Sequence, residues 1–188
     1  LVGNPNTGKT TLFNTLAKAD EHVGNWHGVT VDYKEKKISF GKKDFVLTDL
    51  PGAYSLSSYS FEEAVTRDYL IKHKDAKIIN ICDANNLERN LLLTLELIEM
   101  GFCPTICINM ANDLKKTGKK IDIEKLETIL GQKVFLIDAQ NKKQAKQVLE
   151  FVTNDTKYQK IELPYIVAFV KQFDTLLKDI LNVNEIND

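Results

Sequence analysis

The chain has 188 residues, a formal net charge of −1 at pH 7 and 43% hydrophobic residues. A charge so close to zero argues against a dedicated nucleic-acid-binding domain, which usually carries a basic surplus, and no apolar run approaches the ~20 residues that span a bilayer. Three cysteines without paired spacing indicate reduced thiols in a cytosolic setting rather than a disulfide framework.

Apolar runs of strand length alternate along the chain with amphipathic segments of helix length. The expected strands are the truncated end of a first strand at Leu1–Val2, then Thr30–Phe40, Phe45–Asp49, Lys77–Asp83, Thr105–Asn109 and Lys133–Ile137. The expected helices are Thr10–Ala19, Phe61–Lys74, Leu87–Met100, Ile123–Leu130 and Lys143–Val152. This alternation predicts an α/β fold, with a six-stranded, mostly parallel sheet and helices on both faces. Only Gly41–Asp44 separates the second and third strands, so these two should pair as an antiparallel hairpin.

The chain divides into a large N-terminal part and a short C-terminal extension. The stretch Asn154–Lys160 is polar, and Pro164–Ile180 has apolar residues at helical spacing. We therefore expect one α/β domain over residues 1–153 and a helical extension over residues 154–188.

A glycine-rich motif directly follows the first strand. It fits the pattern G-x-x-x-x-G-K-[ST] at every fixed position and is followed by a second threonine: Gly3, Asn4, Pro5, Asn6, Thr7, Gly8, Lys9, Thr10 and Thr11. Glycines in such a loop let backbone N–H groups turn toward phosphate oxygens at the positive end of the next helix. Lys9 would reach the β- and γ-phosphates, the Thr10 hydroxyl would bind Mg²⁺, and Thr11 would donate to the α-phosphate. The loop alone predicts a nucleoside triphosphate and leaves an ATPase, a kinase and a GTPase open.

Two further motifs favour a GTPase. A D-x-x-G motif runs from Asp49 to Gly52, where the carboxylate can hold Mg²⁺ through water and the glycine N–H can reach the γ-phosphate. Thr30 stands just before the antiparallel strand, where GTPases place a hydroxyl on Mg²⁺. Gly28 and Val29 precede it in the same expected nucleotide-binding loop.

Four segments together resemble a known family, the cytoplasmic G domain of ferrous iron transport protein B (FeoB). These segments are Gly3–Thr11, Val23–Val31, Asp49–Leu70 and Asp83–Leu95. The resemblance implies a Ras-like P-loop GTPase fold over residues 1–153, with GTP and GDP as ligands, Mg²⁺ as cofactor and slow hydrolysis. It also implies an iron-permeating membrane domain C-terminal to this chain, with residues 154–188 as the start of a helical regulatory domain.

The resemblance carries expectations about partners and location as well. The partners would be the transporter's own membrane domain, small accessory iron-transport proteins and further copies of the chain, with no nucleic acid. The location would be the cytoplasmic face of the bacterial inner membrane. Two alternatives stay open: a soluble GTPase of ribosome assembly or tRNA modification, and a nucleotide sensor with little hydrolysis.

The residues expected to act in catalysis are Lys9, Asn6, Thr30 and Gly52. Ras-like enzymes orient the attacking water with a Gln directly after the D-x-x-G glycine, and here that position is Ala53. The resemblance implies a different device, because Asn6 matches a phosphate-loop Asn that helps hold K⁺ beside the β- and γ-phosphates in potassium-activated GTPases. Carbonyls of Gly24 and Trp26 would complete the K⁺ shell. The alternative is that Asn6 only braces the loop.

The first base-recognition motif departs from the family pattern. Family members read N-x-x-D after the strand that ends at Asn109, and the Asp accepts hydrogen bonds from guanine N1–H and the 2-amino group. Here Asn112 falls on the Asp position. An Asn amide keeps one acceptor and sets its N–H₂ against a second donor, so we predict weakened guanine selectivity and better tolerance of xanthine. The rival interpretation is a one-residue slip that lets Asp113 read the base.

The second base-recognition motif is also irregular. Asp138, Ala139 and Gln140 stand where family members show Ser-Ala-Leu, and the Ala139 N–H is expected to contact guanine O6. All the residues expected at the base are Asn109, Met110, Asn112, Asp138, Ala139 and Gln140. The three cysteines are expected in the core, because nothing in this sequence has the ligand spacing of an iron site.

Overall fold

The structure is a computed structural model that describes residues 1–17, 33–41, 43–57, 59–112, 114 and 118–154. The expected residues Gly24, Trp26, Gly28, Val29, Thr30 and Asp113 lie outside this part of the chain, and so does the expected helix Pro164–Ile180.

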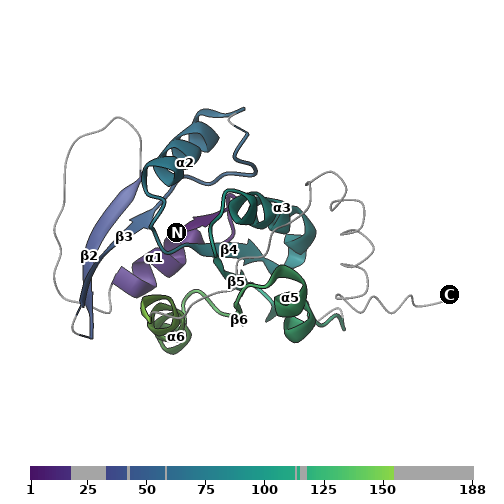
Figure 1. The fold of residues 1–188 in the computed structure, drawn as a ribbon. Coiled ribbons are helices and arrows are strands. Elements are labelled where there is room, and N and C mark those ends of the chain that lie inside the picture. Colours follow the sequence, from purple (N-terminus) through teal and green to yellow (C-terminus); the bar gives the residue numbers. More distant parts are fainter. Residues whose placement is uncertain (18–32, 42, 58, 113, 115–117, 155–188) are drawn as a thin grey trace.

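Parallel strands form the centre of the described fold (Figure 1). They are β1 (Val2–Gly3), β4 (Ile79–Asp83), β5 (Thr105–Asn109) and β6 (Val134–Leu136), hydrogen-bonded in the order β1-β4-β5-β6. The antiparallel hairpin predicted from the short connection is present as β2 (Lys34–Phe40) and β3 (Lys43–Asp49).

The hairpin forms a separate two-stranded sheet among the described residues, so the sheet is divided where the sequence predicts one continuous sheet of six strands. β1 is hydrogen-bonded to β4 in the sheet order, and β3 is paired with β2. β1 and β3 are not paired as neighbouring strands among the described residues. The two strands still touch at their ends, because the Leu1 backbone nitrogen donates to Thr48 O and Leu50 N donates to Leu1 O at 3.2 Å.

The helices begin and end close to the predicted positions. They are α1 (Lys9–Ala17), α2 (Phe61–Lys72), α3 (Leu87–Glu99), α5 (Ile123–Leu130) and α6 (Lys142–Thr153), with a 3₁₀ turn η1 (Ala84–Asn86) before α3. Local signals explain these boundaries. Asp122 and Asn141 accept backbone N–H groups at the starts of α5 and α6, and Gly131 ends α5 with φ 60°, where a side chain would be strained.

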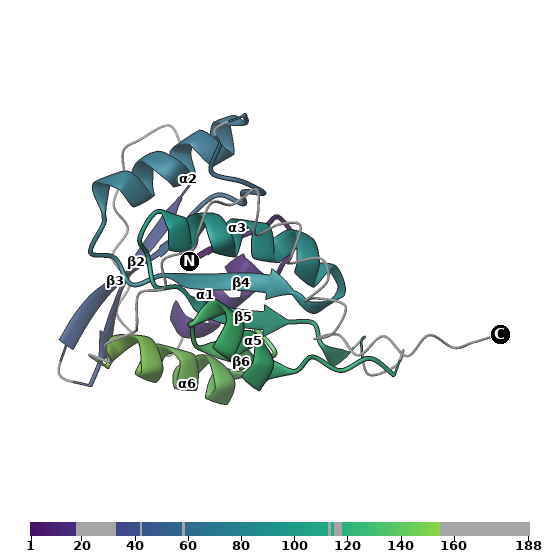
Figure 2. The ribbon, with the colours of Figure 1, turned by 45° about the vertical axis from the view of Figure 1, so that its right-hand side comes forward.

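The helices cover both faces of the parallel sheet, as predicted (Figures 1 and 2). Side chains of β4 alternate between the faces: Ile79 and Ile81 pack with α1 and α6, while Cys82 packs with α3 and α5. The amphipathic character expected for the helix Leu87–Met100 is confirmed in α3, which buries four apolar residues at helical spacing: Leu87, Leu91, Leu95 and Ile98. Within the described residues, no helix is long and apolar enough to span a bilayer.

Candidate functional site

The glycine-rich loop connects β1 to α1 and depends on its two fixed glycines. A Cβ at Gly3 would lie 2.5 Å from the Ile81 carbonyl oxygen. Gly8 has φ 91°, and a Cβ there would lie 2.3 Å from Asn109 Nδ2. Asn6 adopts φ 65° at an exposed position of the loop. The backbone thus takes the inward-turned path that phosphate cradling requires, at the N-terminus of a helix.

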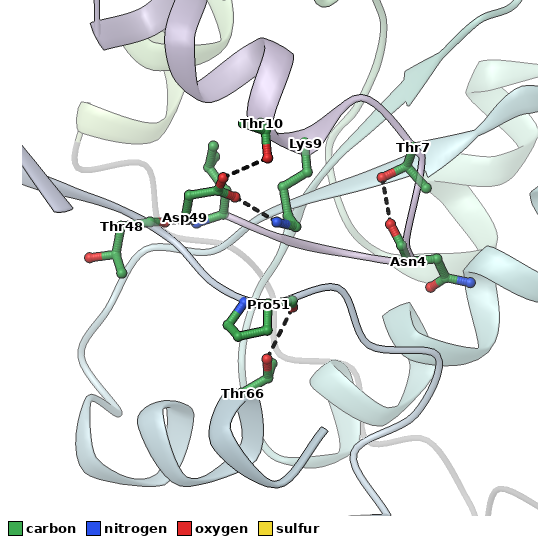
Figure 3. Close-up of polar contacts among 9 residues, drawn as sticks. Asn4, Thr7, Lys9, Thr10, Thr48, Asp49, Pro51 and Thr66 are labelled. Carbon is green, nitrogen blue, oxygen red and sulfur yellow. Dashed lines mark hydrogen bonds and ion pairs between the residues drawn. The ribbon is translucent and has the colours of Figure 1, made fainter. Parts of the chain in front are cut away.

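Three predicted side chains, two from the glycine-rich motif and one from the D-x-x-G motif, meet at the start of α1. Lys9 Nζ lies 2.6 Å from Asp49 Oδ1, and the Thr10 hydroxyl donates to Asp49 Oδ2 at 2.9 Å (Figure 3). The Lys9 and Asp49 side chains are 10% and 5% exposed. This charge pair is therefore shielded from water, and its oxygens are the hard donors that Mg²⁺ prefers. The residues present fit a Mg²⁺ ion held by the Thr10 hydroxyl and, directly or through water, by Asp49.

The remaining loop residues are arranged around this pair. Thr7 is buried and its hydroxyl donates to the Asn4 carbonyl oxygen at 3.0 Å. Asn4 is 2% exposed, and neither polar atom of its side chain has a hydrogen-bond partner among the described residues. The side chain points away from Lys9 in Figure 3. On the side of the loop where Lys9 lies, Asn4 therefore presents its backbone and not its side chain.

Two cavities meet above the loop. One, of about 810 Å³, is lined by Gly52 and by the loop residues 4–6 and 8–11. The other, of about 540 Å³, is lined by residues that follow β5 and β6, including Asn112 and Asp138. Gly8, Thr11 and Met110 border both cavities. The phosphate motifs and the base motifs thus form two halves of one elongated site.

Asn109 is a brace between these halves. It is 5% exposed, its Nδ2 donates to the Thr7 carbonyl oxygen at 2.9 Å, and its Oδ1 accepts from Ala139 N at 3.1 Å. The Ala139 N–H that was expected to contact guanine O6 is therefore hydrogen-bonded within the protein in this structure. Because its side chain spans the phosphate loop and the loop after β6, Asn109 fixes their separation.

We expect Asn109→Ala to destabilise the fold, because it leaves the Thr7 carbonyl and the Ala139 N–H buried without partners. The free energy of unfolding should fall by about 2–4 kcal/mol, measured by urea denaturation. Asn109→Asp, which keeps the acceptor and loses the donor, should retain part of that stability. Unchanged stability in Asn109→Ala would contradict the bracing role.

The two irregular base-recognition motifs both line the cavity of about 540 Å³. Asn112 is exposed at its edge, and Met110 adopts φ 63°. Asp138 and Gln140 lie across it, where Gln140 N donates to Asp138 Oδ1 at 2.9 Å. The structure therefore brings Asn112 to the same cavity as the motif after β6.

The segment after the D-x-x-G motif is held by residues that the sequence analysis did not single out. Glu63 is 8% exposed and accepts hydrogen bonds from Ser55 N, Tyr59 N and Ser60 N at 3.2–3.3 Å. Ser60 in turn caps α2 by accepting from Glu63 N. The pattern S-x-x-E is a capping-box signal that could have predicted this. The guanidinium carbon of Arg89 lies 3.9 Å from the Tyr54 ring centroid, a cation–π contact in the same segment.

The predicted core role of two cysteines agrees with the structure. Cys82 and Cys107 are fully buried, and burial raises the pKa of the Cys82 thiol to about 12 and that of Cys107 further still. Thiols held neutral in this way are poor metal ligands. Among the residues that the structure describes, no group of three or more His, Cys, Asp or Glu side chains could hold a metal ion.

Comparison with known proteins places this site in a family. The curated relatives include the Fe(2+) transporter FeoB of Salmonella typhimurium, 45% identical over 135 residues, and an Fe(2+) transport protein A/Fe(2+) transporter FeoB fusion protein of Porphyromonas gingivalis, 47% identical over 132 residues. Each alignment covers 70% of this chain. The chain spans 18% and 16% of the length of these relatives.

Solved structures agree with this relationship. The FeoB G domain of Methanococcus jannaschii is 38% identical, with a TM-score of 0.68 over 80% of this chain and 93% of that chain. The NFeoB structure of S. thermophilus bound to GDP.AlF4⁻ and K⁺ is 40% identical, with a TM-score of 0.74 over 94% of this chain and 70% of that chain.

Residues 1–152 match the family FeoB_N, described as ferrous iron transport protein B. The expected Ras-like fold is therefore confirmed, and this chain belongs to the FeoB family as a G domain.

Proposed function

We propose that this chain binds and slowly hydrolyses GTP, as the regulatory module of a ferrous iron transporter. The observation that carries the proposal is the Lys9–Asp49–Thr10 constellation at the N-terminus of α1, next to a cavity that adjoins a second cavity lined by the base motifs. Family membership favours this function over a soluble GTPase of ribosome assembly or tRNA modification. The first test is phosphate release from GTP, measured with K⁺ and with Na⁺.

Each residue of the constellation has a distinct part in the reaction. Lys9 neutralises charge on the β- and γ-phosphates, and the loop N–H groups at the start of α1 hold the phosphate oxygens. Thr10 and Asp49 hold Mg²⁺, and we assign Thr30 to the same ion. That ion supplies the positive charge that offsets the negative charge developing in phosphoryl transfer. The Gly52 N–H donates to the γ-phosphate.

K⁺ is the proposed substitute for an activating side chain. Ala53 is 1% exposed and its N–H donates to the Gly3 carbonyl oxygen at 3.2 Å, so this position offers no side chain to orient water. Asn6 lines the phosphate cavity. The S. thermophilus relative was solved with GDP.AlF4⁻ and K⁺, which supports the same ion here, with Gly24 and Trp26 as further ligands.

We expect Asn6→Ala to lose the K⁺ stimulation of GTP hydrolysis, because the variant lacks the side-chain oxygen assigned to the ion. Turnover in K⁺ should fall to the wild-type level in Na⁺, while GDP affinity stays within about threefold. Phosphate release in the two salts measures the first effect, and titration with a fluorescent GDP analogue measures the second. Equal K⁺ rates for the variant and the wild type would contradict the ion site.

Base selectivity is the second part of the proposal. Asn112 lies at the edge of the base cavity, where an amide presents one acceptor and one donor. Guanine presents two donors at this edge, so one of its contacts is lost, whereas the 2-oxo group of xanthine accepts from the amide. We therefore assign this chain a relaxed preference for guanine.

The proposed setting follows from the family. We propose that residues 154–188 begin a helical regulatory domain and that a membrane domain follows, at the cytoplasmic face of the bacterial inner membrane. Fusion to Fe(2+) transport protein A in the Porphyromonas gingivalis relative supports a small accessory protein as a partner, and we also propose contact between copies of the chain.

The buried Ala53 favours one second candidate, a nucleotide sensor with little hydrolysis. Phosphate release near the buffer rate in both salts, with intact GTP binding, would select that candidate.

A further inference from the structure

The segment 53–57 after the D-x-x-G motif has no regular secondary structure, yet it is attached at both ends. At its start, Ala53 N donates to the Gly3 carbonyl oxygen at 3.2 Å. A Cβ at Gly52 would lie 3.1 Å from three atoms of Pro5. The start of the segment is therefore packed directly against the phosphate loop.

The other end is attached to α3 through one carboxylate. Glu96 Oε2 accepts from Leu56 N at 2.5 Å, and Oε1 accepts from the Ser55 hydroxyl at 2.9 Å. The two residues that donate are 40 and 41 positions away from Glu96 in the sequence. Hydrogen bonds to a charged acceptor are shorter and stronger than neutral ones, so this pair is a firm attachment.

The part of α3 that carries Glu96 is fixed by its buried neighbours. Leu95 and Leu97, on either side of Glu96, are at most 2% exposed, and Leu56 packs in the same buried cluster as Leu93 and Leu97. The Glu96 backbone therefore cannot follow the segment if the segment moves. Glu96 on α3, together with Glu63 on α2, which accepts from Ser55 N at 3.2 Å, thus sets how far segment 53–57 lies from the phosphate loop.

We propose that Glu96 is a positioning residue for GTP. By holding Ser55 and Leu56 on α3, it keeps the Gly52 N–H at the phosphate loop, where that N–H meets the γ-phosphate. Only a triphosphate makes this contact, so Glu96 contributes to the preference for GTP over GDP without touching either nucleotide. The inference rests on the proposed nucleotide function of the site.

The test compares Glu96→Ala with the wild type for two ligands, GDP and the non-hydrolysable GTP analogue GppNHp. Affinity for GppNHp should fall about tenfold, while affinity for GDP stays within about twofold. Hydrogen exchange of the Leu56 amide should speed up in the variant. Glu96→Gln keeps an acceptor for Leu56 N and should restore most of the GppNHp affinity. Glu99→Ala, an exposed change on the same helix, is the matched control.

An equal loss for GDP and GppNHp in Glu96→Ala would overturn the inference, because Glu96 would then be a general structural support. Faster exchange of the Leu56 amide with unchanged affinities for both ligands would overturn it as well. Failure of the proposed function has a different signature, in which the wild-type chain itself binds neither ligand.

Discussion

Lys9→Ala is expected to reduce kcat/KM for GTP hydrolysis by about a hundredfold to a thousandfold. The Lys9 side chain lines the phosphate cavity, lies 2.6 Å from Asp49 Oδ1 and is largely shielded from water. Removing it leaves the β- and γ-phosphates next to a carboxylate with less positive charge to offset the repulsion. Phosphate release under single-turnover conditions measures the effect.

Two controls separate this chemical loss from unfolding. Lys146→Ala removes an exposed lysine from α6 and should hydrolyse GTP at the wild-type rate. Far-ultraviolet circular dichroism of Lys9→Ala should retain the helical signal of the wild type. Hydrolysis by Lys9→Ala within threefold of the wild type would show that the phosphate loop is not the catalytic centre.

Asn112→Asp is expected to increase GTP affinity by about tenfold to a hundredfold and to weaken XTP binding. The Asp carboxylate has a second acceptor oxygen in place of the Asn amide N–H₂. This oxygen restores a partner for the 2-amino group of guanine, and loss of the N–H₂ removes the donor that suits the 2-oxo group of xanthine. Titrations with GTP, XTP and ATP give the affinities. ATP affinity should stay low in both proteins.

Asp113→Asn decides between the two interpretations of the motif after β5. If Asn112 reads the base, this change leaves GTP affinity within about threefold. If a one-residue slip brings Asp113 to the base, Asp113→Asn weakens GTP binding and Asn112→Asp leaves it unchanged. The two variants therefore give opposite patterns for the two interpretations.

Patterns within short stretches of sequence predicted most of the fold. The helix Ile123–Leu130 has its cap, its spacing of leucines and its final glycine within ten residues, and its bounds match the prediction. The phosphate loop is similar, because Gly3 and Gly8 act through local backbone geometry at the start of the adjacent helix. The division of the sheet was not predictable from local patterns, since it depends on the pairing of β1 and β3, which lie far apart in the sequence.

Contacts between distant residues explain what the sequence could not predict about the site. Asn109 was expected at the base, but its bonds to Thr7 and Ala139 join positions 102 and 30 residues apart. Glu96 lies on a helix whose periodicity identifies only the buried face, so nothing local indicates that its carboxylate reaches Leu56. Glu63 was predictable in part, because its capping role is local while its bond to Ser55 is not.

The junction of the two cavities at Gly8, Thr11 and Met110 has a consequence for protein engineering. The phosphate half of the candidate site is built from residues after β1 and β3, whereas the proposed base half is built from residues after β5 and β6. Under the proposed function, substitutions at Asn112 and Asp138 would therefore reprogram base preference while the phosphate half keeps its contacts.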